Sequence, residues 1–119
     1  MTYPITIRFL HMNPSPALEQ ALRDKAVKLG QFHSALAGCN VTVEPLGMHQ
    51  HQGREYNVRL DLQLKGKDIA ITRAAAEDPY VAAREAFEAA QRALDAELDV
   101  RRGFVKPKSA RAGRSRLRG

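Results

Sequence analysis

Apolar and polar residues alternate in four segments of the chain, which is the period-two pattern of a strand with one buried face. These segments are residues 4–9, 39–46, 56–64 and 68–73. The third is the most regular, with an apolar residue at every second position from Tyr56 to Leu64. Lys65-Gly66-Lys67 is a short turn signal, so the third and fourth strands are predicted to form a hairpin.

Two other segments carry apolar residues at spacings of three and four, which is typical of a helix with one buried stripe. The first stripe contains Leu18, Leu22, Ala26 and Leu29 and ends near Gly30 or His33. The second contains Tyr80, Ala83, Phe87, Ala90, Leu94 and Leu98. A capping residue followed by proline precedes each stripe, as Ser15-Pro16 and as Asp78-Pro79. Helices are therefore predicted over about residues 16–33 and from Pro79 to near Val100.

The predicted order of elements is β-α-β-β-β-α. Four half-apolar strands and two amphipathic helices are most simply satisfied by a four-stranded sheet with both helices packed on one face, which is an α+β fold. A chain of 119 residues is long enough for one such domain with one modest core. Cys39 is the only cysteine, which excludes an internal disulfide and a cysteine-based zinc site. Its place at a strand start predicts a small buried side chain and not a nucleophile.

Charge is distributed unevenly along the chain. Residues 1–100 hold eleven Lys and Arg against thirteen Asp and Glu, whereas every charged residue after Asp99 is basic. The basic residues of this second part are Arg101, Arg102, Lys106, Lys108, Arg111, Arg114, Arg116 and Arg118. A block of one sign with Gly, Ser and Pro between the charges cannot bury a core. We therefore predict a domain over residues 1–103 and a disordered basic tail over residues 104–119 that is free to bind a polyanion.

Several classes of function find no support. The apolar runs are far shorter than the roughly 20 residues of a membrane span, and the first residues lack the pattern of a signal peptide, so we expect a cytoplasmic protein without a membrane partner. No Gly-rich phosphate loop, nucleophile elbow or paired acid motif occurs, so we expect no enzyme, no small-molecule substrate and no cofactor. His49 and His51 have a spacing that can hold a metal, but a polar loop is the favoured interpretation, with RNA contact by protonated imidazoles as another.

Residues along most of the chain match the pattern of one known family. They are Ser15-Pro16-Ala17-Leu18, Lys28-Leu29, Phe32, Cys39-Asn40-Val41, Val43-Glu44-Pro45, His49 to Gly53, Tyr56, Val58, Leu60, Asp78, Tyr80, Ala83, Phe87, Ala90 and Leu94. On these residues the chain resembles the ribosome hibernation-promoting factor family, also called the sigma-54 modulation or ribosome-associated inhibitor family, over about residues 4–105. The resemblance implies the same β-α-β-β-β-α fold and a non-catalytic factor that binds rRNA in the decoding channel of the small ribosomal subunit. It also implies inactivation of ribosomes under stress. The chain is too short for the second domain of long family members, so the short form is expected; the oligomeric state stays open, with a monomer favoured.

Basic side chains are the candidate RNA contacts, because phosphates dominate the affinity of proteins for nucleic acid. Those on the body are Arg23, Lys25 and Lys28 in the first helix, Lys65 and Lys67 at the hairpin tip, and Arg84 and Arg92 in the second helix. The eight basic residues after Asp99 complete the set. Phe9, Phe32, Tyr56, Tyr80 and Phe87 all fall on stripes predicted to face the core, so base stacking on the outer face of the sheet is not expected.

The second helix departs from the basic helical faces that the family usually presents. Between Asp78 and Val100 it has six acidic residues against Arg84 and Arg92, a net charge of −4. One alternative is therefore a general nucleic-acid-binding module that acts through its tail and loses binding when cut after Gly103. Another is a protein-interaction module whose acidic helix docks a basic partner or its own tail.

Overall fold

The structure is a computed structural model that describes residues 3–46, 55–76 and 78–103. The elements are β1 (Ile5–Phe9), α1 (Pro16–Phe32), β2 (Leu36–Leu46), β3 (Glu55–Leu64), β4 (Lys67–Ala76) and α2 (Pro79–Arg102). The predicted β-α-β-β-β-α order and α+β class are confirmed. The predicted tail over residues 104–119 and the loop with His49 and His51 lie outside the described residues.

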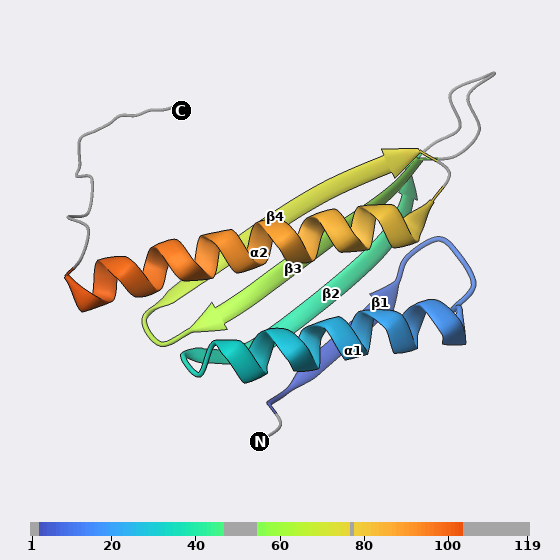
Figure 1. The fold of residues 1–119 in the computed structure, drawn as a ribbon. Helices are drawn as coiled ribbons and strands as arrows, with labels where there is room; N and C mark the ends of the chain where they lie inside the picture. The colour runs from blue at the N-terminus through green and yellow to red at the C-terminus, as the bar shows by residue number, and fades with distance from the viewer. Residues whose placement is uncertain (1–2, 47–54, 77, 104–119) are drawn as a thin grey trace.

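The strands form one four-stranded sheet in the order β1-β2-β3-β4. β1 runs parallel to β2, whereas β3 is antiparallel to both β2 and β4. A parallel pair needs a crossover connection, and α1 supplies it. Both helices lie on the same face of the sheet and run in the same direction, with α1 over β1 and β2 and α2 over β3 and β4 (Figure 1). This arrangement places the two helices side by side.

Two strands are longer than predicted. β2 begins at Leu36, three residues before Cys39, because an irregularity between Leu36 and Gly38 lets the strand continue where strict alternation is broken. β4 continues beyond Arg73 because its last residues, Ala74–Ala76, pair with the first residues of β3. Backbone pairing with the neighbouring strand therefore extends both strands beyond the bounds that the alternation of side chains predicts.

The core lies between the sheet and the two helices. Val41, Val43, Val58, Leu60 and Leu62 of the sheet are fully buried beneath them. The predicted stripe of α1 is buried, and His33 extends it at 7 % exposure. Small side chains line the buried face of α2, where Ala82, Ala83, Ala86, Ala89 and Ala90 allow close packing against the sheet.

The prediction that all five aromatic residues face the core is wrong for Phe32 and Tyr80. Phe87 is buried, Phe9 packs against the core, and Tyr56 is partly buried. Phe32 is 65 % exposed and Tyr80 is 46 % exposed. Phe32 is the last residue of α1, and the buried stripe of that helix continues to His33 and not to Phe32. Tyr80 lies in the first turn of α2, on the edge of its stripe.

α2 also ends later than predicted. Gly103 caps the helix with a φ of 82°, a left-handed conformation that suits glycine. Arg101 and Arg102, counted with the basic tail, therefore belong to the last turn of α2, where cations complement the helix dipole. The helix carries five acidic and four basic residues, so its net charge is −1 instead of the −4 counted between Asp78 and Val100, because Asp78 is the N-cap and Arg101 and Arg102 belong to the helix.

Glu97 joins α2 to the turn between β3 and β4. Its Oε1 accepts a hydrogen bond from Lys67 Nζ at 2.9 Å, and its Oε2 accepts one from Arg101 Nε at 3.0 Å. Arg101 also donates from Nη2 to the carbonyl of Lys65 at 2.8 Å. The bond from Lys67 and then that from Arg101 hold the pKa of Glu97 below its usual value.

Replacing Glu97 by glutamine is expected to lower the free energy of unfolding at pH 7 by about 0.5 kcal/mol, because ion pairs near the surface contribute about 0.2–1 kcal/mol. The pKa of Glu97 is depressed in the folded state, so its stabilisation is present above the unfolded pKa of about 4.3 and is lost as pH falls through the folded pKa. Urea unfolding of both proteins between pH 7 and pH 3 measures this. A difference that stays constant over that range would contradict the assignment.

Candidate nucleic-acid interface

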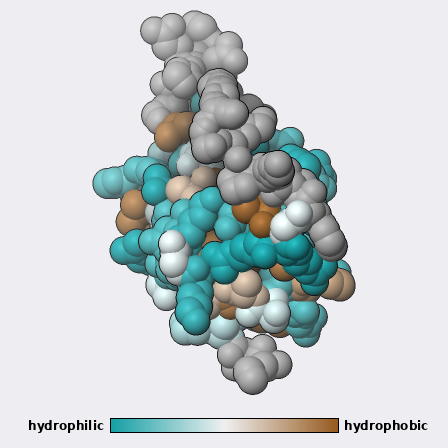
Figure 2. Space-filling view, turned by 90° about the vertical axis from the view of Figure 1, so that its left-hand side faces the viewer, coloured by the Kyte–Doolittle hydropathy of each residue, from teal (hydrophilic) through white to brown (hydrophobic). Residues whose placement is uncertain are grey.

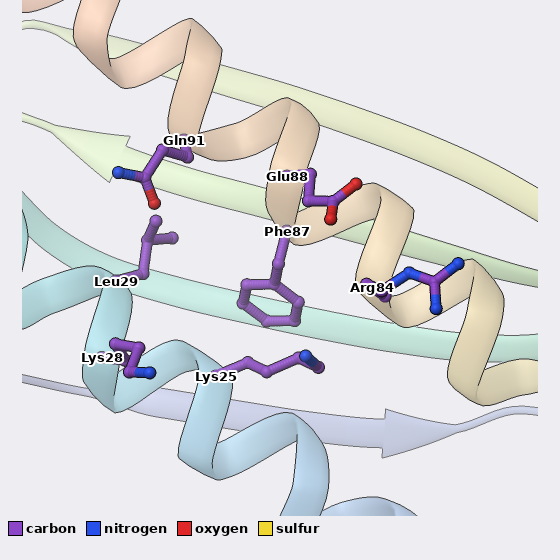
Figure 3. Close-up of a pocket in the computed structure, with 7 residues that line it drawn as sticks. All are labelled: Lys25, Lys28, Leu29, Arg84, Phe87, Glu88 and Gln91. Carbon is purple, nitrogen blue, oxygen red and sulfur yellow. The ribbon is translucent and has the colours of Figure 1, made fainter.

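A groove of about 220 Å³ runs between α1 and α2. Lys25, Lys28 and Leu29 line it from α1, and Arg84, Phe87, Glu88 and Gln91 line it from α2. Figure 3 shows the ring of Phe87 pointing from α2 toward Lys25 and the side chain of Leu29 pointing toward Gln91. Leu29 and Phe87 are buried, so the groove has an apolar floor below polar walls.

Helical periodicity explains why these residues meet. Lys25 and Lys28 lie beside the buried stripe of α1, on the flank that faces α2. Arg84, Phe87 and Gln91 follow one another at spacings of three and four, so they occupy a single flank of α2. Because the two helices run in the same direction, these flanks face each other along the groove (Figures 1 and 3).

The walls of the groove are predominantly basic. Three cations and one acid, Glu88, line it. Within the part of the chain that the structure describes, Lys25, Lys28 and Arg84 take part in no ion pair. Glu88 lowers the net charge of the groove but pairs with none of the three cations, so they can bind the phosphates of a nucleic acid.

Arg23 lies apart from this groove, although it is close in sequence to Lys25 and Lys28. At 3.6 residues per turn it is rotated by about 160° from Lys25 and about 140° from Lys28. Its Nη2 is 3.3 Å from Oε2 of Glu19, one turn earlier on α1. Of the three predicted cations of α1, Lys25 and Lys28 therefore line the same groove as Arg84, whereas Arg23 lies on another flank of the helix.

The remaining predicted contacts lie on other surfaces. Lys67 and Arg101 are bound to Glu97, and Lys65 is exposed in the adjoining turn. Arg92 and Arg102 are exposed on α2 but do not line the groove. The tail cations lie outside the described residues, namely Lys106, Lys108, Arg111, Arg114, Arg116 and Arg118.

The open face of the sheet carries polar side chains, as predicted from the alternation. Its central row includes Arg59, which forms an ion pair with Asp61 at 3.0 Å. Exposed or partly buried members of this face are Thr6, Arg8, Asn40, Thr42, Glu44, Asn57, Arg59, Asp61 and Gln63. The face offers neither aromatic rings nor a concentration of unpaired cations among its described residues, so it is a weaker candidate for a nucleic-acid interface than the groove.

Cys39 has the character of a core residue. Its side chain is fully buried on β2, and burial raises the pKa of its thiol to about 11. A thiol in that state holds little of the nucleophilic thiolate at neutral pH. Over residues 3–46, 55–76 and 78–103, no group of three or more potential ligands could hold a metal ion. None of the described helices is long and apolar enough to cross a membrane.

The fold and the groove define a class of small α+β domains in which two parallel helices on one face of a sheet present a basic surface. Residues 5–102 match the family model described as sigma 54 modulation protein / S30EA ribosomal protein. The chain therefore belongs to this family of ribosome-associated proteins, as the resemblance in its sequence predicts.

Solved structures show the same fold at low sequence identity. A ribosomal subunit interface protein from Coxiella burnetii is 14 % identical, with a TM-score of 0.63 over 78 % of this chain and 94 % of that one. The N-terminal domain of protein Y from Thermus thermophilus is 15 % identical, with a TM-score of 0.63 over 79 % of this chain and 96 % of that domain. A search of curated proteins gave no match.

Proposed function

We propose that this protein binds rRNA of the small ribosomal subunit through the groove between α1 and α2 and inactivates ribosomes under stress. The observation that carries the proposal is the meeting of Lys25, Lys28 and Arg84 in one groove, where Glu88 is the single acid and none of the three cations forms an ion pair among the described residues. Membership of a family of ribosome-associated proteins supports it. Binding of this kind needs no cofactor and no catalytic group, and it places the protein in the cytoplasm with the ribosomes.

Phosphate neutralisation is the physical basis of the proposed binding. Each cation that contacts a phosphate releases condensed counterions, so affinity falls as salt rises. The unpaired cations of the groove keep this capacity, whereas Arg23, Lys67 and Arg101 already bind carboxylates. The folded domain therefore determines where the protein binds on the small subunit. The basic tail would add affinity that depends little on the RNA sequence.

Co-sedimentation with separated ribosomal subunits tests the proposal. The protein is expected to sediment with small subunits and not with large subunits at low salt, and to lower the rate of protein synthesis in a cell-free system. Release should follow as salt is raised. A protein that stays at the top of the gradient with small subunits in excess at low salt would overturn the proposal.

A variant of the full chain separates the groove from the tail. With the six cations of residues 104–119 changed to glutamine, binding to small subunits is expected to persist. The slope of log affinity against log salt should become shallower by at most about 4, at about 0.7 for each phosphate that the tail no longer neutralises. Complete loss of binding would instead favour a module that acts through its tail.

A further inference from the structure

Two aromatic side chains are exposed on the helices of this domain. Phe32 is 65 % exposed at the end of α1, and Tyr80 is 46 % exposed in the first turn of α2. The other large hydrophobic residues exposed in the described part of the chain, Leu10 and Val27, are aliphatic.

Neither ring lines the groove itself, but helical spacing puts each one on the flank of its helix that faces the groove. Phe32 follows Lys28 by four residues on α1, and Tyr80 precedes Arg84 by four residues on α2. Residues four apart on a helix are neighbours on one face. Each aromatic ring is therefore one helical turn from a groove cation, whereas Val27 is about 140° away from Phe32 around α1.

The two rings lie at opposite ends of the groove. Tyr80 precedes Phe87 by seven residues, which is about 10 Å along α2. At the other end His33, next to Phe32, has its Nε2 3.5 Å from Oδ1 of Asp95. Asp95 is eight residues beyond Phe87, about 12 Å further along the helix. The cations of the groove thus lie between two aromatic positions that are about 22 Å apart.

The chemistry around the rings favours a nucleobase over other partners. The exposed Asp95 lies against His33, the residue next to Phe32, and a carboxylate disfavours a phosphate at that end of the groove but tolerates a neutral base. Figure 2 views the end of the molecule that carries the β3–β4 turn and the end of α1, and the hydrophobic surface at this one end occurs as small separate patches. A protein partner would more often require a continuous apolar patch.

We propose that Phe32 and Tyr80 are base-stacking positions for unpaired RNA. Two bases of one single-stranded segment stack on the rings, while phosphates between them lie over Lys25, Lys28 and Arg84. Unpaired RNA is the ligand because stacking needs an open base face, which a duplex does not offer. The inference rests on the proposed function and deepens it. It specifies that the bound RNA is single-stranded and adds two uncharged stacking contacts to the contacts made by the cations.

A fluorescence experiment tests stacking directly. The chain has no tryptophan, so Phe32→Trp introduces a single indole at the proposed position. Titration with an oligoadenylate of about 12 nucleotides, within the length that such sites cover, is expected to quench it. Val27→Trp is the matched control, because it is exposed on the same helix away from the groove, and its emission should stay unchanged.

Affinity measurements separate stacking from charge. Phe32→Leu and Tyr80→Leu are each expected to lower affinity for the oligoadenylate and for small subunits about tenfold, with an unchanged salt slope, because base stacking involves no counterion release. Lys28→Gln should instead make the slope shallower by about 0.7. Thermal unfolding of each variant verifies that the fold is kept.

The outcomes distinguish this inference from the function on which it rests. Wild-type protein that fails to bind small subunits overturns both. If wild type binds while both leucine variants bind equally well and the indole is unquenched, base stacking is overturned and the proposed function stands. Loss of subunit affinity without loss of oligoadenylate affinity would assign the rings to a protein contact and would also overturn base stacking.

Discussion

Replacing Lys25, Lys28 and Arg84 together by glutamine is expected to lower affinity for small ribosomal subunits about 100-fold at 0.1 M salt. Each phosphate contact contributes about 0.7 to the slope of log affinity against log salt, so three contacts contribute about 2. The affinities of wild type and variant should converge as salt approaches about 1 M, where counterion release no longer favours binding. Filter binding or sedimentation across a salt series measures both quantities.

The matched control removes the same charge from places outside the groove. Arg23, Arg59 and Arg92 can be changed to glutamine together, and none of them lines the groove. This variant is expected to keep affinity within about threefold of wild type, since the removed charges lie outside the groove and two of them, on Arg23 and Arg59, are already paired with carboxylates. Equal losses in the two triple variants would show that net charge, and not the groove, determines binding.

The alternation of apolar and polar residues predicted the sheet because each strand has one buried face. Where every residue of a segment has the same small side chain, the alternation carries no signal, as in the alanines at the end of β4, although Ala75 packs against the core. The start of β2 was hidden for a related reason, since the irregularity at Gly38 breaks the period of two. Such extensions depend on the neighbouring strand, which a single segment of sequence does not contain.

The candidate site was only partly predictable. Lys25 and Lys28 stand out in the sequence, but their meeting with Arg84 follows from two parallel helices packed on one sheet, which is a tertiary relation. The proximity of Arg23 in sequence was misleading because a helix turns consecutive residues to different sides. A helical projection would have separated it, since it lies about 160° from Lys25.

The exposure of Phe32 could also have been found from the periodicity. The stripe of Leu18, Leu22, Ala26 and Leu29 continues to His33, which is buried, and Phe32 lies on its flank. Both Phe32 and Tyr80 were assigned to core-facing stripes, and Tyr80 was the first member of the second stripe. The structure instead leaves both rings exposed beside the groove that binds RNA in the proposed function. At these positions the rings contribute little to the core, which is consistent with a role in binding.

Truncating Leu60 to alanine is expected to lower the free energy of unfolding by about 3 kcal/mol, within the range of about 2–5 kcal/mol for a large side chain removed from a core. Leu60 is fully buried on β3 and pairs with Val41 on β2 and Ile71 on β4. Both neighbouring strands fix its position, so the cavity has little room to collapse. Urea unfolding measures the decrease.

Thr72→Ala is the control for this effect, because Thr72 is exposed on the open face of β4. It is expected to change stability by less than about 1 kcal/mol. Below the unfolding transition, Leu60→Ala should bind small subunits with the affinity of wild type, since Leu60 lies beneath the helices and outside the groove. A folded Leu60→Ala protein with weakened binding would contradict this expectation. It would show that binding also depends on the packing of the helices on the sheet, because that packing positions the exposed cations of the groove.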